Sequence, residues 1–403
     1  MGARSFSRSV LAVATVAGLA AGSAAVRATP THAAGTLAIG VVADLTGQGA
    51  AYGVSIANGA RLAGQVLNKA GGVDGAQVDV IVDDPGSVNS QVINIFQQDA
   101  NAKHVIAIVG PTLSSEAFPA DPVANGLGVP VVATSNTAKG IPQIGQYIFR
   151  LGLGEAAVIP LAMKAALHHL HFKTAALIYG NDNAFTKADG QIFTAEAQAL
   201  GVKLVDTETY ATGDKDFSTQ LTKIKGKNPD VILCGALQRE AVPILVQARQ
   251  LGITARFIGG NGFNTPVVAQ QAGKAAEGAV EGTAWFANSK TPQNQAFIKA
   301  YKAAYGKPPD QLAAQAYDAI DVIADGRAHD GRARVGVINR DINMAIRPTS
   351  DLAQWGVTDR WSAPLATLAS GRGDCEDYAI AKYVALREAG LSESDVRLVI
   401  VRD

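Results

Sequence analysis

The sequence lacks an excess of charge of either sign, because 35 lysines and arginines balance 35 aspartates and glutamates over 403 residues. Without a basic excess, nucleic acid is not expected as a partner. Cysteine is scarce: Cys234 and Cys375 are widely separated, so the sequence offers neither a disulfide framework nor a zinc-site spacing. Aromatic residues make up only 6% of the chain, whereas glycine occurs 42 times. This composition favours helices packed closely on sheets, with many short turns.

The longest apolar run near the N-terminus is too short to span a membrane. It covers Val10–Ala25, about sixteen residues, where a span needs ~20. Arg4 and Arg8 precede it, and small residues suited to cleavage follow it. These features predict a secretory signal peptide over residues 1–34. No cysteine follows the run, so we expect a periplasmic protein without a lipid anchor.

From Thr36 onward, strand-like apolar runs alternate with stretches of helical spacing. The strand-like runs are 37–42, 78–82, 105–109, 130–133, 175–179, 203–205, 231–234 and 256–258. The helical stretches are 52–67, 88–100, 114–125, 155–168, 187–200, 217–225, 240–251, 293–305 and 311–324. This alternation predicts an α/β fold with parallel sheets flanked by helices. A break near residue 150 predicts two lobes: residues 35–150 with 285–325, and residues 151–284.

A strand, a turn and a helix N-terminus follow one another between Val105 and Glu116. The apolar run ends at Gly110, and helical spacing begins near Ser114. Free N–H groups at a helix N-terminus, with serine hydroxyls beside them, suit a carboxylate. The alternative is an N-cap serine at an ordinary turn. Because no nucleophile–base pair is evident in this stretch, the pattern favours binding over catalysis.

Five phrases in this order resemble the type I periplasmic binding proteins of ABC importers, in the branch that includes branched-chain amino-acid receptors. They are Gly40–Gly47, Asn68–Gly75, Ile108–Ser115, Val129–Ser135 and Ala316–Ala319. The resemblance covers residues 36 to about 325. It implies a non-enzymatic substrate-binding protein whose two lobes close on a small ligand and which an inner-membrane ABC permease recognises.

The same resemblance implies a ligand site. Ser114, with Ser115 beside it, matches the serine that binds the ligand carboxylate, and Ser135 and Thr137 match a second loop that supplies a backbone carbonyl and a threonine hydroxyl. Phe185 matches an aromatic residue of the second lobe that stacks on the ligand. Tyr52 and Phe263 are further candidates for the cleft wall.

One position departs from the family pattern. An acidic residue normally accepts the ligand's amino group in the loop after a later strand, and here Asn261 occupies that position. A neutral amide cannot neutralise a buried ammonium group, and an unpaired buried charge costs several kcal/mol. The sequence therefore leaves two ligand classes open, an amino acid with Glu240 or Asp182 as the substitute acid, and a carboxylate without an amine. A turn residue with no ligand contact is the alternative for Asn261.

The C-terminal residues have a different character. After a charged junction at 326–334, residues 335–403 resemble the bacterial transglutaminase-like cysteine proteinases, chiefly through Gly373–Ala379. The resemblance implies Cys375 as the nucleophile and Asp374, Glu376 and Asp377 as calcium ligands. A cysteine nucleophile also needs a base, and none of the six histidines lies after Cys375. We therefore expect a truncated, inactive fragment and no required cofactor, with calcium at the fragment as an option. The alternative function is a calcium-dependent periplasmic cysteine peptidase with a fused binding module.

Overall fold

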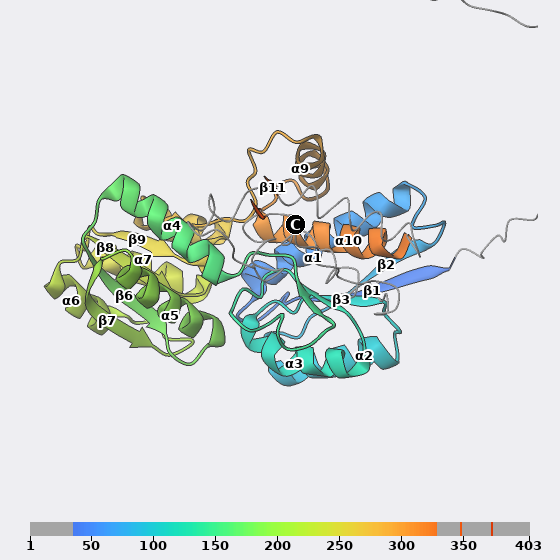
Figure 1. Ribbon diagram of the computed structural model, residues 1–403, viewed down its shortest axis with the longest axis horizontal. Helices are drawn as coiled ribbons and strands as arrows, with labels where there is room; N and C mark the ends of the chain where they lie inside the picture. Colours follow the sequence, from blue (N-terminus) through green and yellow to red (C-terminus); the bar gives the residue numbers. More distant parts are fainter. Residues whose placement is uncertain (1–34, 329–346, 349–371, 374–403) are drawn as a thin grey trace, which may run out of the picture. The chain divides into compact units, whose positions relative to one another are not determined.

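The computed structural model describes residues 35–328, 347–348 and 372–373 (Figure 1). Two five-stranded parallel sheets, each flanked by helices, account for most of these residues. The predicted fold class is therefore confirmed. Residues 347–348 and 372–373 pair as the short parallel strands β11 (Arg347–Pro348) and β12 (Arg372–Gly373).

The first sheet has the strand order β2-β1-β3-β4-β5. Its strands are β1 (Thr36–Val42), β2 (Gln77–Asp83), β3 (Ala107–Val109), β4 (Val131–Ala133) and β5 (Ile148–Arg150). Strand β1 lies between β2 and β3 and ends in a continuous buried apolar run, as expected for a strand covered by helices on both faces.

Within the described residues, five helices belong to this first lobe. They are α1 (Ala50–Lys69), α2 (Asn89–Asn101), α3 (Ser114–Leu127), α9 (Pro292–Tyr305) and α10 (Gln311–Ala328). Helices α1 and α10 lie side by side although they are far apart in the sequence (Figure 1). Gly59 permits this close approach, because a Cβ atom there would collide with the backbone of Ala313. The chain thus returns to the first lobe after completing the second.

The second lobe is built on a sheet of order β10-β9-β8-β6-β7. Its strands are β6 (Thr174–Gly180), β7 (Lys203–Tyr210), β8 (Val231–Gly235), β9 (Arg256–Gly259) and β10 (Val280–Glu281). Its helices are α4 (Glu155–Leu170), α5 (Ala184–Ala199), α6 (Ser218–Lys227), α7 (Gln238–Gln250) and α8 (Pro266–Ala272), with 3₁₀ turns η1 (Asn261–Phe263) and η2 (Gly273–Ala276).

Some element bounds differ from those the sequence predicts. Strand β7 runs five residues beyond the predicted 203–205, because it pairs with β6 along its whole length. Strands β5 and β10 were not predicted; they are only three and two residues long, too short to show a pattern. Helix α5 begins at Ala184, three residues before the predicted start, because the Asn183 side chain caps it. The lobe boundaries stay a prediction.

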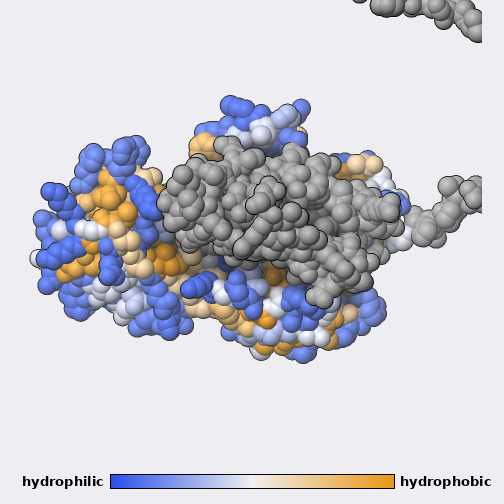
Figure 2. Space-filling view, viewed as in Figure 1, coloured by the Kyte–Doolittle hydropathy of each residue, from blue (hydrophilic) through white to orange (hydrophobic). Residues whose placement is uncertain are grey.

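In the part of the chain that the structure describes, no helix is both long and apolar enough to cross a membrane. Where the described surface of the second lobe is visible in Figure 2, hydrophilic residues are interspersed with apolar ones. Leu161 on α4 is one of the exposed apolar residues, with 65% of its surface accessible.

Helix α3 carries a buried acid with no counter-charge beside it. Asp121 is fully buried, and neither of its carboxyl oxygens has a hydrogen-bond partner among the described residues. Burial raises the pKa of Asp121 to about 8. Burial, together with the nearby Asp44, likewise raises the pKa of Glu116 to about 8. The folded protein therefore holds protons that the unfolded chain releases.

We predict that the protein becomes less stable as the pH rises from about 5 to about 8.5, because the folded state binds more protons than the unfolded state over this window. Asp121→Asn removes one of the titrating groups and should make the fall shallower. The measurement is the thermal unfolding midpoint at several pH values. Equal slopes for wild type and variant would show that Asp121 does not titrate in this way.

Candidate functional site

A pocket lies between the two lobes, at the ends of the strands where the loops of both sheets meet. The first lobe contributes residues that follow β3 and β4, together with side chains from α1 and α10. The second lobe contributes residues that follow β6, β8 and β9. The empty space is about 450 Å³ with the open mouth included. The pocket is therefore narrow and suits a small molecule.

Ser114 is placed to donate a hydrogen bond into the pocket. It is the first residue of α3, and Glu116 supports this helix start by accepting from the Leu113 N–H at 2.8 Å. The Ser114 hydroxyl oxygen accepts from the Ala138 N–H at 3.3 Å, which leaves its own proton free. A free hydroxyl proton at the positive end of a helix suits a negatively charged group.

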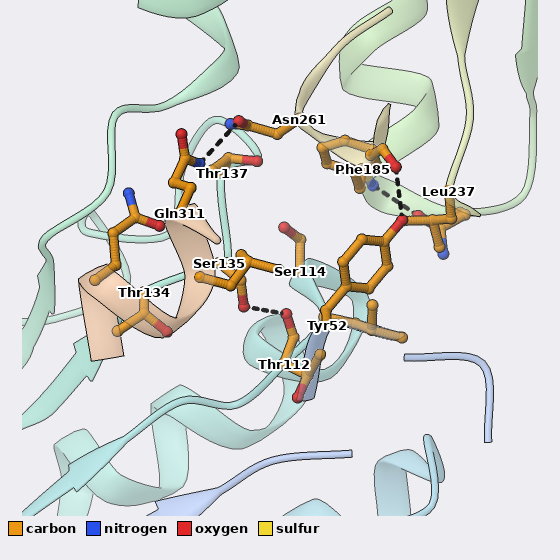
Figure 3. A pocket seen from close by; sticks show the side chains of 15 residues that line it. Tyr52, Thr112, Ser114, Thr134, Ser135, Thr137, Phe185, Leu237, Asn261 and Gln311 are labelled. Carbon is orange, nitrogen blue, oxygen red and sulfur yellow. Dashed lines mark hydrogen bonds between the residues drawn. The ribbon is translucent and has the colours of Figure 1, made fainter. Parts of the chain in front are cut away.

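Ser135 and Thr137 have the opposite polarity. The Ser135 hydroxyl donates to the Thr112 carbonyl at 2.6 Å (Figure 3). The Thr137 hydroxyl lies 2.9 Å from Oε1 of Glu155. A carbonyl can only accept, and an ionised carboxylate can only accept. When Glu155 is ionised, both hydroxyl protons are therefore used, and each hydroxyl oxygen can still accept a hydrogen bond. One wall of the pocket thus holds a donor and two acceptors.

Phe185 and Leu237 form the apolar part of the second-lobe wall. Phe185 is the second residue of α5, and its N–H donates to the Asn183 side chain at 2.9 Å, which fixes the start of the helix. Both side chains are 5% exposed. Leu312 of α10 and the ring of Tyr52 extend the apolar lining from the first lobe.

The orientation of the Asn261 amide follows from a chain of hydrogen bonds. The Ala284 N–H donates to Oε1 of Gln311, so the Gln311 amide nitrogen must point the other way. That nitrogen donates to Oδ1 of Asn261 at 3.3 Å (Figure 3). The Asn261 amide nitrogen has no hydrogen-bond partner among the described residues. The side-chain amide of Asn261 nevertheless acts on the buried Glu155, whose ionised form it favours.

A buried carboxyl group lies directly behind Thr137 and Asn261. Glu155 is the first residue of α4 and is fully buried. Its Oε1 accepts from the Thr137 hydroxyl at 2.9 Å and from the Asn261 N–H at 3.1 Å. Burial raises the pKa of Glu155 to about 7, and these hydrogen bonds and the charge of Arg150 oppose the rise.

A second buried acid lies beside Glu155. Asp189 of α5 is fully buried, and neither carboxyl oxygen has a hydrogen-bond partner in the described part of the chain. A Cβ atom on Gly260 would lie 2.6 Å from Oδ2 of Asp189 and 2.9 Å from Oε2 of Glu155, so the two carboxyl groups flank one glycine. Burial, reinforced by the charge of Glu155, raises the pKa of Asp189 well above its usual range.

Tyr52 joins the two lobes directly. It lies on α1, and its hydroxyl donates to the Gly262 carbonyl at 2.9 Å and accepts from the Gln238 N–H. Both partners belong to the second lobe. Since the whole side chain is buried, each of these bonds is protected from competing water.

Five of the six residues that the sequence predicted as ligand-binding line this pocket: Ser114, Ser135, Thr137, Phe185 and Asn261. Ser115 is half-buried and is not part of the lining. Tyr52 lines the pocket, whereas Phe263 is buried elsewhere in the core. Their roles in binding remain predictions.

The substitute acids considered from the sequence lie elsewhere. Glu240 accepts from the Gly213 N–H at 3.1 Å, and Asp182 accepts from Thr212. Neither lines the pocket. Sequence reasoning missed Glu155, because a glutamate in the first turn of a helix is common and gives no sign that loops from two lobes will meet around it.

The C-terminal candidates lie outside the described residues: Cys375, Asp374, Glu376 and Asp377. Among the described residues, no group of three or more potential metal ligands comes together. Cys234 is fully buried in β8, and burial raises the pKa of its thiol far above the usual range, so it behaves as a core residue.

Comparison with known proteins finds two family matches. Residues 36–338 match the model of the periplasmic binding proteins, and residues 321–403 match that of the bacterial transglutaminase-like cysteine proteinases. The second match includes the end of α10. Among curated proteins, a leucine-, isoleucine-, valine-, threonine- and alanine-binding protein of Pseudomonas aeruginosa is 31% identical over 303 residues, covering 75% of this chain and 80% of the relative.

Solved structures show the same fold. The branched-chain amino-acid transporter substrate-binding protein LivJ of Streptococcus pneumoniae, in complex with isoleucine, is 30% identical with a TM-score of 0.69, covering 72% of this chain and 83% of that one. A solute-binding protein from Rhodopseudomonas palustris in complex with 3,4-dihydroxybenzoic acid is 22% identical with a TM-score of 0.67, covering 74% and 84%. The second likeness concerns the fold alone.

We predict that Tyr52→Phe weakens the contact between the lobes, because a buried donor and a buried acceptor lose their partner at a cost of about 1–3 kcal/mol. The ligand-free variant should spend more time with its lobes apart, which small-angle X-ray scattering records as a larger radius of gyration. Tyr305→Phe is the matched control, since the Tyr305 hydroxyl donates to the Asn58 carbonyl within the first lobe. Identical scattering from Tyr52→Phe and wild type would contradict the bridging role.

Proposed function

Because the chain belongs to the periplasmic binding protein family and is a substrate-binding protein of the ABC-importer type, we propose that it captures a small aliphatic amino acid between its two lobes. The signal peptide predicted over residues 1–34 would export it to the periplasm, where an ABC permease would receive the loaded form. The ligands bound by similar proteins, isoleucine among them, support this class.

The observation that carries the proposal is the polarity of the pocket wall. Ser114 offers a hydroxyl proton at a helix N-terminus, which suits a carboxylate. Ser135 and Thr137 offer acceptor oxygens, which suit an ammonium group. An α-amino acid carries both groups on one carbon atom. The apolar lining of Phe185 and Leu237 then faces an aliphatic side chain.

A carboxylate without an amine is the second candidate. No acidic side chain lines the pocket itself. A carboxylate ligand without an ammonium group therefore leaves no positive charge unpaired in this pocket. A thermal-shift screen with amino acids and matched carboxylic acids separates the two candidates, because a ligand that binds only the folded state raises its melting temperature.

Ligand contacts from both lobes provide the mechanism of closure. Ser114 and Thr137 belong to the first lobe, whereas Phe185 and Asn261 belong to the second. A ligand that contacts both sets stabilises the arrangement in which the lobes meet, and it does so only by its differential affinity for that arrangement. The lobe surfaces brought together in this way would then be recognised by the permease.

We predict that Ser114→Ala weakens leucine or isoleucine binding at least tenfold, because a hydrogen bond to a charged group contributes about 1.5–3 kcal/mol. Isothermal titration calorimetry measures the affinity. Ser115→Ala is the neighbouring control, since Ser115 does not line the pocket and should leave the affinity unchanged. Equal affinities for Ser114→Ala and wild type would remove Ser114 from the site.

We further propose that ligand binding requires no metal, including any calcium that Asp374, Glu376 and Asp377 would hold. Hard carboxylate oxygens are the ligands calcium prefers, and the pocket lining contains none. Protein treated with a chelator should therefore give the same titration curve as protein supplied with calcium. A loss of binding on chelation that calcium restores would overturn this proposal.

A further inference from the structure

We propose that Glu155, held beside Asp189 in a buried acidic pair, supplies the negative charge for the ligand's ammonium group, so that binding an amino acid releases a proton. The inference rests on the function proposed above and identifies which of the two ligand classes the pocket selects. Glu155 does not line the pocket, and it acts through the groups it touches.

The geometry places Glu155 one layer behind the pocket wall. Its carboxyl group contacts Thr137 from the first lobe and Asn261 from the second, and both of these residues line the pocket. Its backbone N–H also donates to the Thr137 carbonyl at 3.0 Å. The side-chain amide of Asn261 also favours the ionised form of Glu155. The charge of Glu155 is thus coupled to both lobes at the acceptor end of the pocket.

The second member of the pair explains why a proton is stored there. The carboxyl group of Asp189 is fully buried and has no hydrogen-bond partner among the residues described. It shares the space beside Gly260 with Glu155, where any larger residue would intrude. Two carboxylates in one dry space do not both ionise readily, so one of them holds a proton.

Neighbouring groups indicate that Asp189 keeps its proton while Glu155 titrates. Arg150 of β5 is the positive group that acts on Glu155, and it favours the ionised form. Asp189 instead interacts electrostatically with Tyr52, Tyr210 and Cys234, which carry no positive charge, and the acid Glu240 acts on the same three groups. With a pKa of about 7, Glu155 is the member that changes charge near neutrality.

Thr137 transmits this change to the ligand. An ionised Glu155 accepts a hydrogen bond from the Thr137 hydroxyl. The Thr137 oxygen then has a lone pair available to accept a hydrogen bond from an ammonium group in the pocket. A protonated Glu155 can itself donate to Thr137, which frees the hydroxyl proton to point into the pocket. That arrangement opposes an ammonium group but tolerates a carboxylate. Protonation of Glu155 therefore changes both the charge and the hydrogen-bond polarity at this end.

The test compares leucine with 4-methylpentanoate, the same molecule without its amine, by isothermal titration calorimetry from about pH 5.5 to about pH 8. Leucine keeps its ammonium charge over this range. We expect its affinity to fall as the pH drops below about 7, by at most tenfold per pH unit for a single proton. Titrations in two buffers of different ionisation enthalpy should show proton release with leucine and none with 4-methylpentanoate.

Variants assign the effect to Glu155. Glu155→Gln keeps the size of the side chain but cannot ionise, so leucine should bind at least tenfold more weakly at pH 8 and with no dependence on pH. Asp121→Asn is the matched control: it removes another buried acid without a partner, which lies outside the pocket lining, and should keep the wild-type profile of affinity against pH. If Glu155→Gln does not fold, Thr137→Val serves instead, because it removes the hydroxyl group through which Glu155 acts on the ligand.

The outcomes separate this inference from the function on which it rests. Tight leucine binding by the wild type with a flat pH profile and no proton release would overturn the role of Glu155 and leave the proposed function standing. Binding of 4-methylpentanoate as tightly as leucine at pH 8 would also overturn it. Failure to bind any amino acid or carboxylate would overturn the proposed function itself.

Discussion

The site depends on one buried carboxyl group, because Glu155 is the point at which loops from both sheets meet. Thr137 follows β4 of the first sheet and Asn261 follows β9 of the second, and each donates to Oε1 of Glu155. Removing a charge from water is costly unless hydrogen bonds compensate for it. The Asn261 N–H and the N-terminus of α4 belong to the same lobe as Glu155, whereas the Thr137 hydroxyl is a donor that reaches Glu155 only when the lobes are together. The ionised state of Glu155 and the meeting of the lobes are therefore coupled.

Tyr52 reinforces the same arrangement by a different principle. Its hydroxyl spans from α1 to Gly262 and Gln238 through uncharged hydrogen bonds, which do not depend on pH near neutrality. The pocket is thus bordered by one contact between lobes that responds to protonation and one that does not. A ligand that binds between them adds its own contacts to this junction, and the difference between its affinities for the open and closed forms shifts the population between them.

The fold could be read from the sequence because its signals are local. The apolar run of β1, the Gly71–Gly72 break after α1 and the alternation of elements indicate parallel sheets without any knowledge of distant contacts. Ser114 was predicted because a helix start follows a buried strand, and Thr137 because its loop resembles the ligand-binding loop of the family. What could not be predicted depends on residues distant in sequence: β10 exists only through its pairing with β9, and Gln311 reaches Asn261 from fifty residues away.

Asn261 illustrates why a departure from the family pattern must be judged in three dimensions. From the sequence alone, an amide at the position of an acid indicates that the counter-charge for an ammonium group has been lost. In the structure, the backbone N–H and the side-chain amide of Asn261 both act on Glu155, so the amide stands between the pocket and a carboxyl group. An acid at position 261 would place a further negative charge next to Glu155 and Asp189, where like charges repel strongly. Asn261 and the buried acidic pair are therefore mutually dependent. The negative charge lies on Glu155 behind the pocket wall, and the residue at position 261, between Glu155 and the pocket, has to be neutral.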